Sequence, residues 1–201
     1  MKYIKRQLQN KIIKAIAKFF SVVLMVGFLA LLSSFVNEQN EYFASSTPGV
    51  ISFKAKNDRY SAQGFFERWK FTKSEMKERN NMETYSGELV IDMSSIKEKS
   101  EKLTNHLRAD DYFFVKEFPL CKMSIDNIKK GKDGKYTAVG KINLRGIKSE
   151  VPINFIVKRI NPVIVKGELQ IDRVLHKIGI GNKKVNNKIA VDFEAEIPYS
   201  L

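Results

Sequence analysis

Leu103 to Pro119 reads Leu-Thr-Asn-His-Leu-Arg-Ala-Asp-Asp-Tyr-Phe-Phe-Val-Lys-Glu-Phe-Pro and interrupts the pattern of the chain. Upstream and downstream, apolar and polar residues alternate as in strands, whereas here the leucines and the histidine fall at helical spacing. Asp110 or Asp111 can cap a short helical turn, and the aromatic run that follows carries more apolar surface than an exposed turn tolerates. We therefore expect a helical insertion, entered from Ser95 or Ser100, whose rings cover a larger apolar structure.

On either side of this insertion, eight segments alternate with period two and are bounded by turn residues. Such strands pair antiparallel when short turns join them, and closing the sheet removes its exposed edges. The charged stretch Thr72–Thr84 is expected to be a surface excursion. The sequence thus predicts an all-β, eight-stranded antiparallel barrel. Its expected strands are Gly49–Lys56, Tyr60–Phe71, Tyr85–Met93, Leu120–Lys129, Lys135–Leu144, Ser149–Ile160, Val163–Ile171 and Asn187–Pro198.

The expected interior combines small and aromatic residues. An eight-stranded barrel is either filled by its own side chains or holds one slender ligand. Small inward residues suggest a lumen shaped for an apolar guest, but alternation of small and large residues to fit a barrel's taper is equally compatible with this pattern. The predicted lining residues are Phe53, Trp69, Phe71, Phe113, Phe114, Tyr136, Ala138, Gly140, Ile142, Phe155, Gly167 and Phe193.

The N-terminal region predicts a signal peptide or a membrane anchor helix over residues 1–36. Phe19–Val36 holds 18 residues without a charge and follows a basic run, which keeps that end in the cytoplasm and everything after Asn37 outside. The apolar run is longer than a usual signal core and no clean small-x-small cleavage site follows, which favours an uncleaved anchor. Residues 37–48 are expected to be a tether and residues 49–201 the barrel domain.

The charge of the chain favours a membrane partner over nucleic acid. The formal net charge is +13, and six of the 35 basic residues precede Phe19. The remaining 29 exceed the 22 acids by seven and are interspersed with them, whereas nucleic-acid binding requires a gathered basic patch beside exposed aromatics. An anionic membrane surface attracts such charge.

Cysteine and histidine positions argue against a disulfide, a metal site and catalysis. Cys121 is the only cysteine, so no intrachain disulfide forms, and it is expected to be a small buried hydrophobe. His106, His176 and Cys121 do not have metal-ligand spacing. Nucleophile-elbow, zinc-protease and phosphate-loop motifs are absent from the sequence. We expect no enzyme activity, no catalytic residue, no metal and no cofactor.

Three motifs resemble those of the YceI-like, polyisoprenoid-binding family. The run His106–Phe114 with Phe118-Pro119 resembles that family's His-Leu…Asp-x-Phe-Phe…Pro signature. The segment Lys141–Val151 is similar to its Leu-Thr-Leu-His-Gly-Val-Thr-Lys turn, with Arg145 in place of the usual histidine. The third is Arg173 followed by Gly-Ile-Gly at 179–181, although 174–178 is longer than the family pattern.

This resemblance implies a lipocalin-like barrel in which a long isoprenoid lipid lies along the interior. It also implies an extracytoplasmic, periplasmic location and, in some members, dimers. His106 and Arg173 are the candidate contacts to a lipid head group. We expect His106 to pin the neighbouring loop, and Arg173 to form an ion pair inside the wall.

Three functions follow as hypotheses from different classes. The first is a carrier or sequestering protein for a long apolar lipid, of polyisoprenoid or isoprenoid quinone type, at the outer face of the membrane. The second is a structural or interaction module of the cell envelope, whose barrel is filled by its own side chains. The third is a lipid-modifying enzyme, which would need an acid–base pair facing the lumen.

Overall fold

A computed structural model describes residues 47–56, 61–79, 82–131 and 133–197. The chain divides into two compact units, Met1–Ala44 and Ser45–Leu201, and the described residues all belong to the second. The expected anchor helix at 1–36 and most of the expected tether therefore lie outside the described residues. Among the helices in these ranges, none is long and apolar enough to cross a membrane.

The described part of the chain forms ten strands, one α-helix and one short 3-10 turn. Every pair of neighbouring strands is antiparallel, in the order β3-β4-β6-β7-β8-β9-β10-β1-β2-β5. The elements are β1 (Gly49–Lys56), β2 (Ser61–Phe66), β3 (Trp69–Arg79), β4 (Met82–Asp92), η1 (Met93–Ser95), β5 (Ile96–Glu98), α2 (Glu101–Arg108), β6 (Leu120–Lys130), β7 (Lys135–Leu144), β8 (Ile147–Ile160), β9 (Val163–Asp172) and β10 (Lys188–Glu196).

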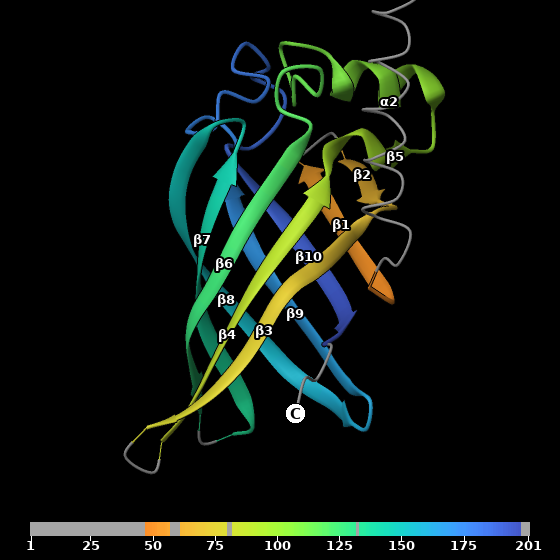
Figure 1. Cartoon of the computed structure of the whole chain (residues 1–201). Helices are drawn as coiled ribbons and strands as arrows, with labels where there is room; N and C mark the ends of the chain where they lie inside the picture. Colours follow the sequence, from red (N-terminus) through yellow and green to blue (C-terminus); the bar gives the residue numbers. More distant parts are fainter. Residues whose placement is uncertain (1–46, 57–60, 80–81, 132, 198–201) are drawn as a thin grey trace, which may run out of the picture. The chain divides into compact units, whose positions relative to one another are not determined.

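The sheet is curled and barrel-like, as Figure 1 shows, but it is not the expected eight-stranded barrel. The expected strand Tyr60–Phe71 is split into β2 and β3, because the chain changes neighbours at Glu67 and Arg68. β2 pairs with β1 and β5, whereas β3 pairs with β4. The guanidinium of Arg68 holds this corner through a 2.9 Å hydrogen bond from its Nε to the buried carboxylate of Asp92. These two residues covalently join strands that lie near opposite ends of the sheet order, so the sheet curls back on itself.

Two further differences concern the ends of β4. The short strand β5 was not expected, and Ile96, its first residue, is fully buried. The stretch Thr72–Thr84 is not a surface excursion, because β3 and β4 run through it as a long hairpin. Backbone amides and carbonyls pair in such a hairpin whatever side chains they carry, which is why composition alone did not predict it.

The helix is shorter than the expected insertion and ends before the acidic pair. The hydroxyl of Ser100 caps α2 by accepting from the N–H of Leu103, and the helix ends at Arg108. No helix starts at Asp110 or Asp111 within the described residues, so that expectation is wrong. The aromatic run after them forms turns, in which the N–H of Phe113 donates to the carbonyl of Leu107 at 3.0 Å.

Alternation along the strands separates a buried inner face from an outer face. On β7, Ala138, Gly140, Ile142 and Leu144 are buried while their neighbours are partly or fully exposed. A buried aliphatic side chain contributes about 1.5–3 kcal/mol, so one apolar row per strand holds the curled sheet together. The core residues from the other strands include Ile51, Phe53, Trp69, Leu89, Cys121, Met123, Val151, Ile153, Val165, Leu169, Ile171 and Ala195.

The two ends of the sheet differ. One end, which we call the helical end, is formed by α2, the turns 109–119 and the loop 173–187 (Figure 1). At the opposite end, called the hairpin end, the chain reverses between β6 and β7 and between β8 and β9. The space that the sheet encloses lies between these two ends.

Candidate functional site

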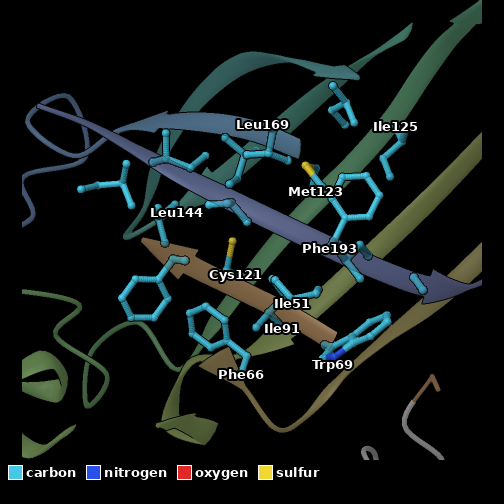
Figure 2. A pocket seen from close by; sticks show the side chains of 18 of the residues that line it. Ile51, Phe66, Trp69, Ile91, Cys121, Met123, Ile125, Leu144, Leu169 and Phe193 are labelled. Atoms are coloured by element: carbon cyan, nitrogen blue, oxygen red, sulfur yellow. The ribbon is translucent and has the colours of Figure 1, made fainter. Parts of the chain in front are cut away.

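The curled sheet encloses an apolar cavity of about 700 Å³. Its wall draws on every strand except β5 in the described residues, and on α2 and the loop 173–187. Figure 2 shows Ile51, Ile91, Cys121 and Met123 turned towards this space from three strands. Sites for small molecules are typically about 300–1,000 Å³ and mostly apolar, so the cavity has the size and character of a ligand site.

Eight of the twelve predicted lining residues lie in the cavity wall. Aromatic rings make up much of it, and besides the pair Trp69 and Phe71, whose centroids lie 6.3 Å apart, they form a group near each end. Below the helical end, Phe66 lies 5.9 Å from Phe53 and 6.3 Å from Phe113, measured between ring centroids. Towards the hairpin end, Tyr136 and Phe155 stack at 5.2 Å. The eight are Phe53, Trp69, Phe71, Phe113, Tyr136, Ile142, Phe155 and Phe193.

The predicted small residues Ala138, Gly140 and Gly167 do not line the cavity. A Cβ added to Gly140 would lie 2.7 Å from the sulfur of Met123, and one on Gly167 would lie 2.5 Å from the ring of Phe193. Both distances are shorter than real Cβ contacts. These residues leave room for neighbouring side chains, and those side chains, not the glycines, face the cavity.

Phe114 is the fourth predicted lining residue that does not line the cavity, and it lies at the helical end. Its φ of 47° turns its side chain away from the neighbouring Phe113, which does line the cavity. The Phe114 ring packs against Phe118 at 5.9 Å, and the guanidinium of Arg145 lies over it at 5.9 Å. Both phenylalanines were predicted to line the cavity because they are adjacent in the sequence, but the backbone turns their side chains to different sides.

Arg173 lies in the wall at the helical end and is 5% exposed. The expected ion pair is wrong, because all five guanidinium N–H groups donate to backbone carbonyls instead. An arginine has five such donors, so none remains for another acceptor. A contact from this guanidinium to a lipid head group stays a prediction, which the geometry disfavours. The acceptors are the carbonyls of Asn186 (2.9 Å), Ile178 (3.1 Å), Gly179 (2.6 Å), Asn182 (2.8 Å) and Val185 (2.8 Å).

His106 lies in the wall on α2, with its ring 4.4 Å from that of Tyr112. The hydroxyl of Tyr112 accepts a 3.1 Å hydrogen bond from the amide of Asn182. His106 thus packs on a side chain that joins the turns after α2 to the loop 173–187. This position fits the pinning role, and a head-group contact by His106 stays a prediction.

Nothing in the sequence indicates the role of His176. Its side chain is 1% exposed, with Nδ1 3.1 Å from the carbonyl of Leu144 and Nε2 3.0 Å from the hydroxyl of Ser149. A carbonyl only accepts, so Nδ1 carries a proton and donates it to the carbonyl of Leu144. The ring therefore ties the loop after β9 to the β7–β8 hairpin. Only a contact map could have revealed this, because both partners lie more than 25 residues away.

Cys121 is buried in the wall as expected. Burial disfavours the charged thiolate and raises the pKa of its thiol to about 12. No group of three His, Cys, Asp or Glu residues in the described ranges lies close enough to hold a metal ion. Of the two histidines, only His106 lines the cavity, and no carboxylate among the described residues does.

The three motifs singled out from the sequence meet at the helical end. The guanidinium of Arg145 donates to the carbonyls of Asp110 and Lys177. The N–H of Gly179 donates to the carbonyl of Asp111 at 2.7 Å. Segments 106–119, 141–151 and 173–181 therefore form one closure over this end of the sheet, and most of the cavity wall comes from residues outside them.

A curled, all-antiparallel sheet around an apolar cavity defines a barrel-like protein with an internal site. The chain belongs to the YceI-like family, because the model of the YceI-like domain matches residues 44–197. The resemblance seen in the sequence is thereby confirmed. Among curated proteins, no sequence matches the chain.

Several solved structures share the fold at low sequence identity. BcnA of Burkholderia cenocepacia is 18% identical with a TM-score of 0.64, covering 73% of this chain and 94% of its own. A polyisoprenoid binding domain from Saccharophagus degradans, implicated in plant cell wall breakdown, is 14% identical with a TM-score of 0.54, covering 77% and 97%. The YceI protein of Campylobacter jejuni is 15% identical with a TM-score of 0.54, covering 69% and 85%.

Proposed function

We propose that this protein is a non-enzymatic binding or carrier protein for a long apolar lipid, of polyisoprenoid or isoprenoid quinone type. The observation that carries the proposal is the apolar cavity of about 700 Å³ inside the sheet. The similarity of the chain's fold to a polyisoprenoid binding domain from Saccharophagus degradans supports the choice of ligand class. No cofactor is needed, because holding the lipid is the whole activity.

The affinity would come from burial of the hydrocarbon chain. Each methylene removed from water contributes about 0.8 kcal/mol. The rings of Tyr136 and Phe155, which lie in the cavity wall, would contact a flat, branched chain over a large area. The lining side chains are almost all apolar, so they offer few hydrogen bonds and select for length and shape more than for polar groups. The protein would replace the bilayer as a solvent for a molecule that water rejects.

The proposed location is outside the cytoplasm, in the periplasm. The basic, then apolar residues 1–36 would hold the second unit beside the membrane as an anchor, or direct its secretion if they are cleaved. The anchor would keep the cavity near the membrane that supplies a lipid, whereas cleavage would release the second unit into the periplasm. Some relatives are expected to be dimers, and a dimer of this chain stays a prediction.

The alternative, a structural module filled by its own side chains, is disfavoured by the cavity. A core at ordinary density leaves few voids larger than a water molecule, and a space of about 700 Å³ is much larger than such voids. The enzyme hypothesis lacks the acid–base pair that it requires, because His106 has no carboxylate beside it in the described part of the cavity wall.

The test is extraction of the purified full-length protein with organic solvent, followed by mass spectrometry. We expect one class of apolar lipid in a fixed ratio to protein. A matched pair of variants on β6 locates it: Ile125→Trp places a large ring in the cavity, whereas Ser124→Trp places the same ring on the outer face. Only the first should lose the lipid. Recovery of no apolar molecule from the folded unmodified protein would refute the proposal.

A further inference from the structure

The cavity opens to solvent at the hairpin end. Ile160, the last residue of β8, lines the cavity and is nevertheless 82% exposed. Its register partner Val163 also lines the cavity, as do Val157 and Phe155 further along the strand. A lining residue this exposed lies at a mouth. An apolar path therefore runs from the stacked rings of Tyr136 and Phe155 to the tip of the β8–β9 hairpin.

The helical end has a different character. The guanidinium of Arg173 and the Asn182–Tyr112 hydrogen bond hold the loop 173–187 over that end. Three exposed apolar residues lie on this loop, Val174, Leu175 and Ile180, but none of them lines the cavity. The N–H of Gly179 donates to the backbone carbonyl of exposed Asp111, while residues 173–187 themselves carry four basic residues and no acid. The exposed apolar surface at this end is therefore separate from the cavity.

Basic residues outnumber acidic ones in two of the turns at the hairpin end. Residues 155–167 carry three cations and no acid, and residues 127–136 outside position 132 carry three cations and one acid. Lys158 pairs with Glu194 at 3.1 Å and Lys135 with Asp133 at 3.0 Å. In the described residues, the other exposed cations of these turns form no ion pair, and they are Lys129, Lys130, Arg159 and Lys166. The ammonium of Lys130 lies over the ring of Tyr136, 6.0 Å from its centroid. The β3–β4 hairpin adds no net charge, because residues 73–85 hold three basic and three acidic residues.

We propose that the hairpin end docks on an anionic membrane surface, with Ile160 among the lipid head groups and the unpaired cations on their phosphates. Exposed apolar residues flanked by cations are what binds an interface of anionic lipids, by partial burial and by charge. Docking would place the mouth of the cavity directly on the bilayer. This role of the mouth in lipid transfer rests on the proposed function, whereas the docking itself does not.

The experiment follows the tip of the hairpin with a polarity-sensitive dye. The full-length Cys121→Ala variant receives a single new cysteine, either Asn161→Cys beside Ile160 or Leu175→Cys at the helical end, labelled with nitrobenzoxadiazole. Each labelled protein is mixed with vesicles of phosphatidylcholine alone, or of equal parts phosphatidylcholine and phosphatidylglycerol. We expect a blue-shifted, brighter emission from position 161 with the anionic vesicles only, and no change from position 175.

Charge variants complete the test. In the position 161 protein, Lys129→Gln, Lys130→Gln and Arg159→Gln should lower the ratio of inserted to free tip by roughly fivefold for each cation removed. The matched variants Lys148→Gln, Lys183→Gln and Lys188→Gln remove exposed cations at the helical end and should leave the ratio unchanged. An unchanged emission at 161, a response at 175 instead, or equal responses with both vesicle types would overturn the proposal. No bound ligand is involved, so the lipid-extraction result stands or fails separately.

Discussion

Replacing Arg173 with lysine tests whether one guanidinium holds the closure of the helical end. The arginine donates to five carbonyls, and its two Nη1 bonds, to Ile178 and Gly179, are buried. Lysine has three donors at most, so at least two carbonyls lose their partner. Hydrogen bonds to charged groups contribute about 1.5–3 kcal/mol each, which gives an expected loss of roughly 3–6 kcal/mol from the free energy of unfolding. That is a large fraction of the stability of an ordinary domain, about 5–15 kcal/mol.

The assay is urea denaturation of the Arg173→Lys and unmodified proteins, with hydrogen exchange of the backbone amides of residues 174–187 as a local readout. Exchange in that loop should accelerate more than exchange in β7, if the guanidinium acts on the loop. Arg159→Lys, an exposed arginine at the hairpin end, is the control and should change stability by less than about 0.5 kcal/mol. A loss below about 1 kcal/mol for Arg173→Lys, with unchanged exchange in the loop, would show that water or the backbone satisfies those carbonyls without the arginine.

Three further predictions concern the wall and its supports. Because burial raises the pKa of the Cys121 thiol from 9.0 to about 12, the thiol stays protonated in the folded protein while the unfolded chain ionises. We therefore compare the free energy of unfolding of the unmodified protein with that of Cys121→Ala, by urea denaturation at several pH values. The difference between the two proteins should not change with pH below pH 9, and between pH 9 and 12 the unmodified protein should lose up to about 4 kcal/mol relative to the variant. Gly167→Ala brings a Cβ to 2.3 Å from the carbonyl of Asn154 and should lower the melting temperature by an amount equivalent to about 1–3 kcal/mol, whereas Gly181→Ala meets nothing within 4 Å and should leave it unchanged; equal effects would contradict the packing role of Gly167. His176→Phe leaves a buried carbonyl without its donor and should cost about 1–3 kcal/mol in calorimetric unfolding, while an unaltered protein would mean that the ring only fills space.

The strands and most of the wall were predictable because their signal is local. The expected bounds of the segments at 49–56 and 135–144 agree with those of β1 and β7. Side chains in a strand alternate between two faces, so the inward positions Phe53, Tyr136 and Ile142 follow from parity alone once a strand is assigned. Parity failed at Ala138, Gly140 and Gly167. These residues do face inward, but whether an inward residue touches the cavity depends on the size of its neighbours across the sheet.

The motifs were enough to identify the family, but they did not reveal the roles of their residues. Arg145, Arg173 and the run after His106 were separate signals in the sequence, and the structure brings them together through hydrogen bonds between residues 32 and 35 positions apart. The sequence could not show this, because a side chain's acceptor is defined by distance in space. For the same reason, Arg173 was expected to pair with an acid, whereas it binds the carbonyls of its own loop.

By itself, the sequence determined that the second unit is an antiparallel all-β structure with apolar inner faces, because alternation with period two is a property of neighbouring residues. Only the tertiary structure decided that the chain changes partners at Glu67 and Arg68, that the enclosed space stays open over about 700 Å³, and that it has a mouth beside Ile160. Each of these depends on how strands far apart in the chain fill, or leave unfilled, the same volume. Packing of that kind is a property of the assembled sheet and of no single segment.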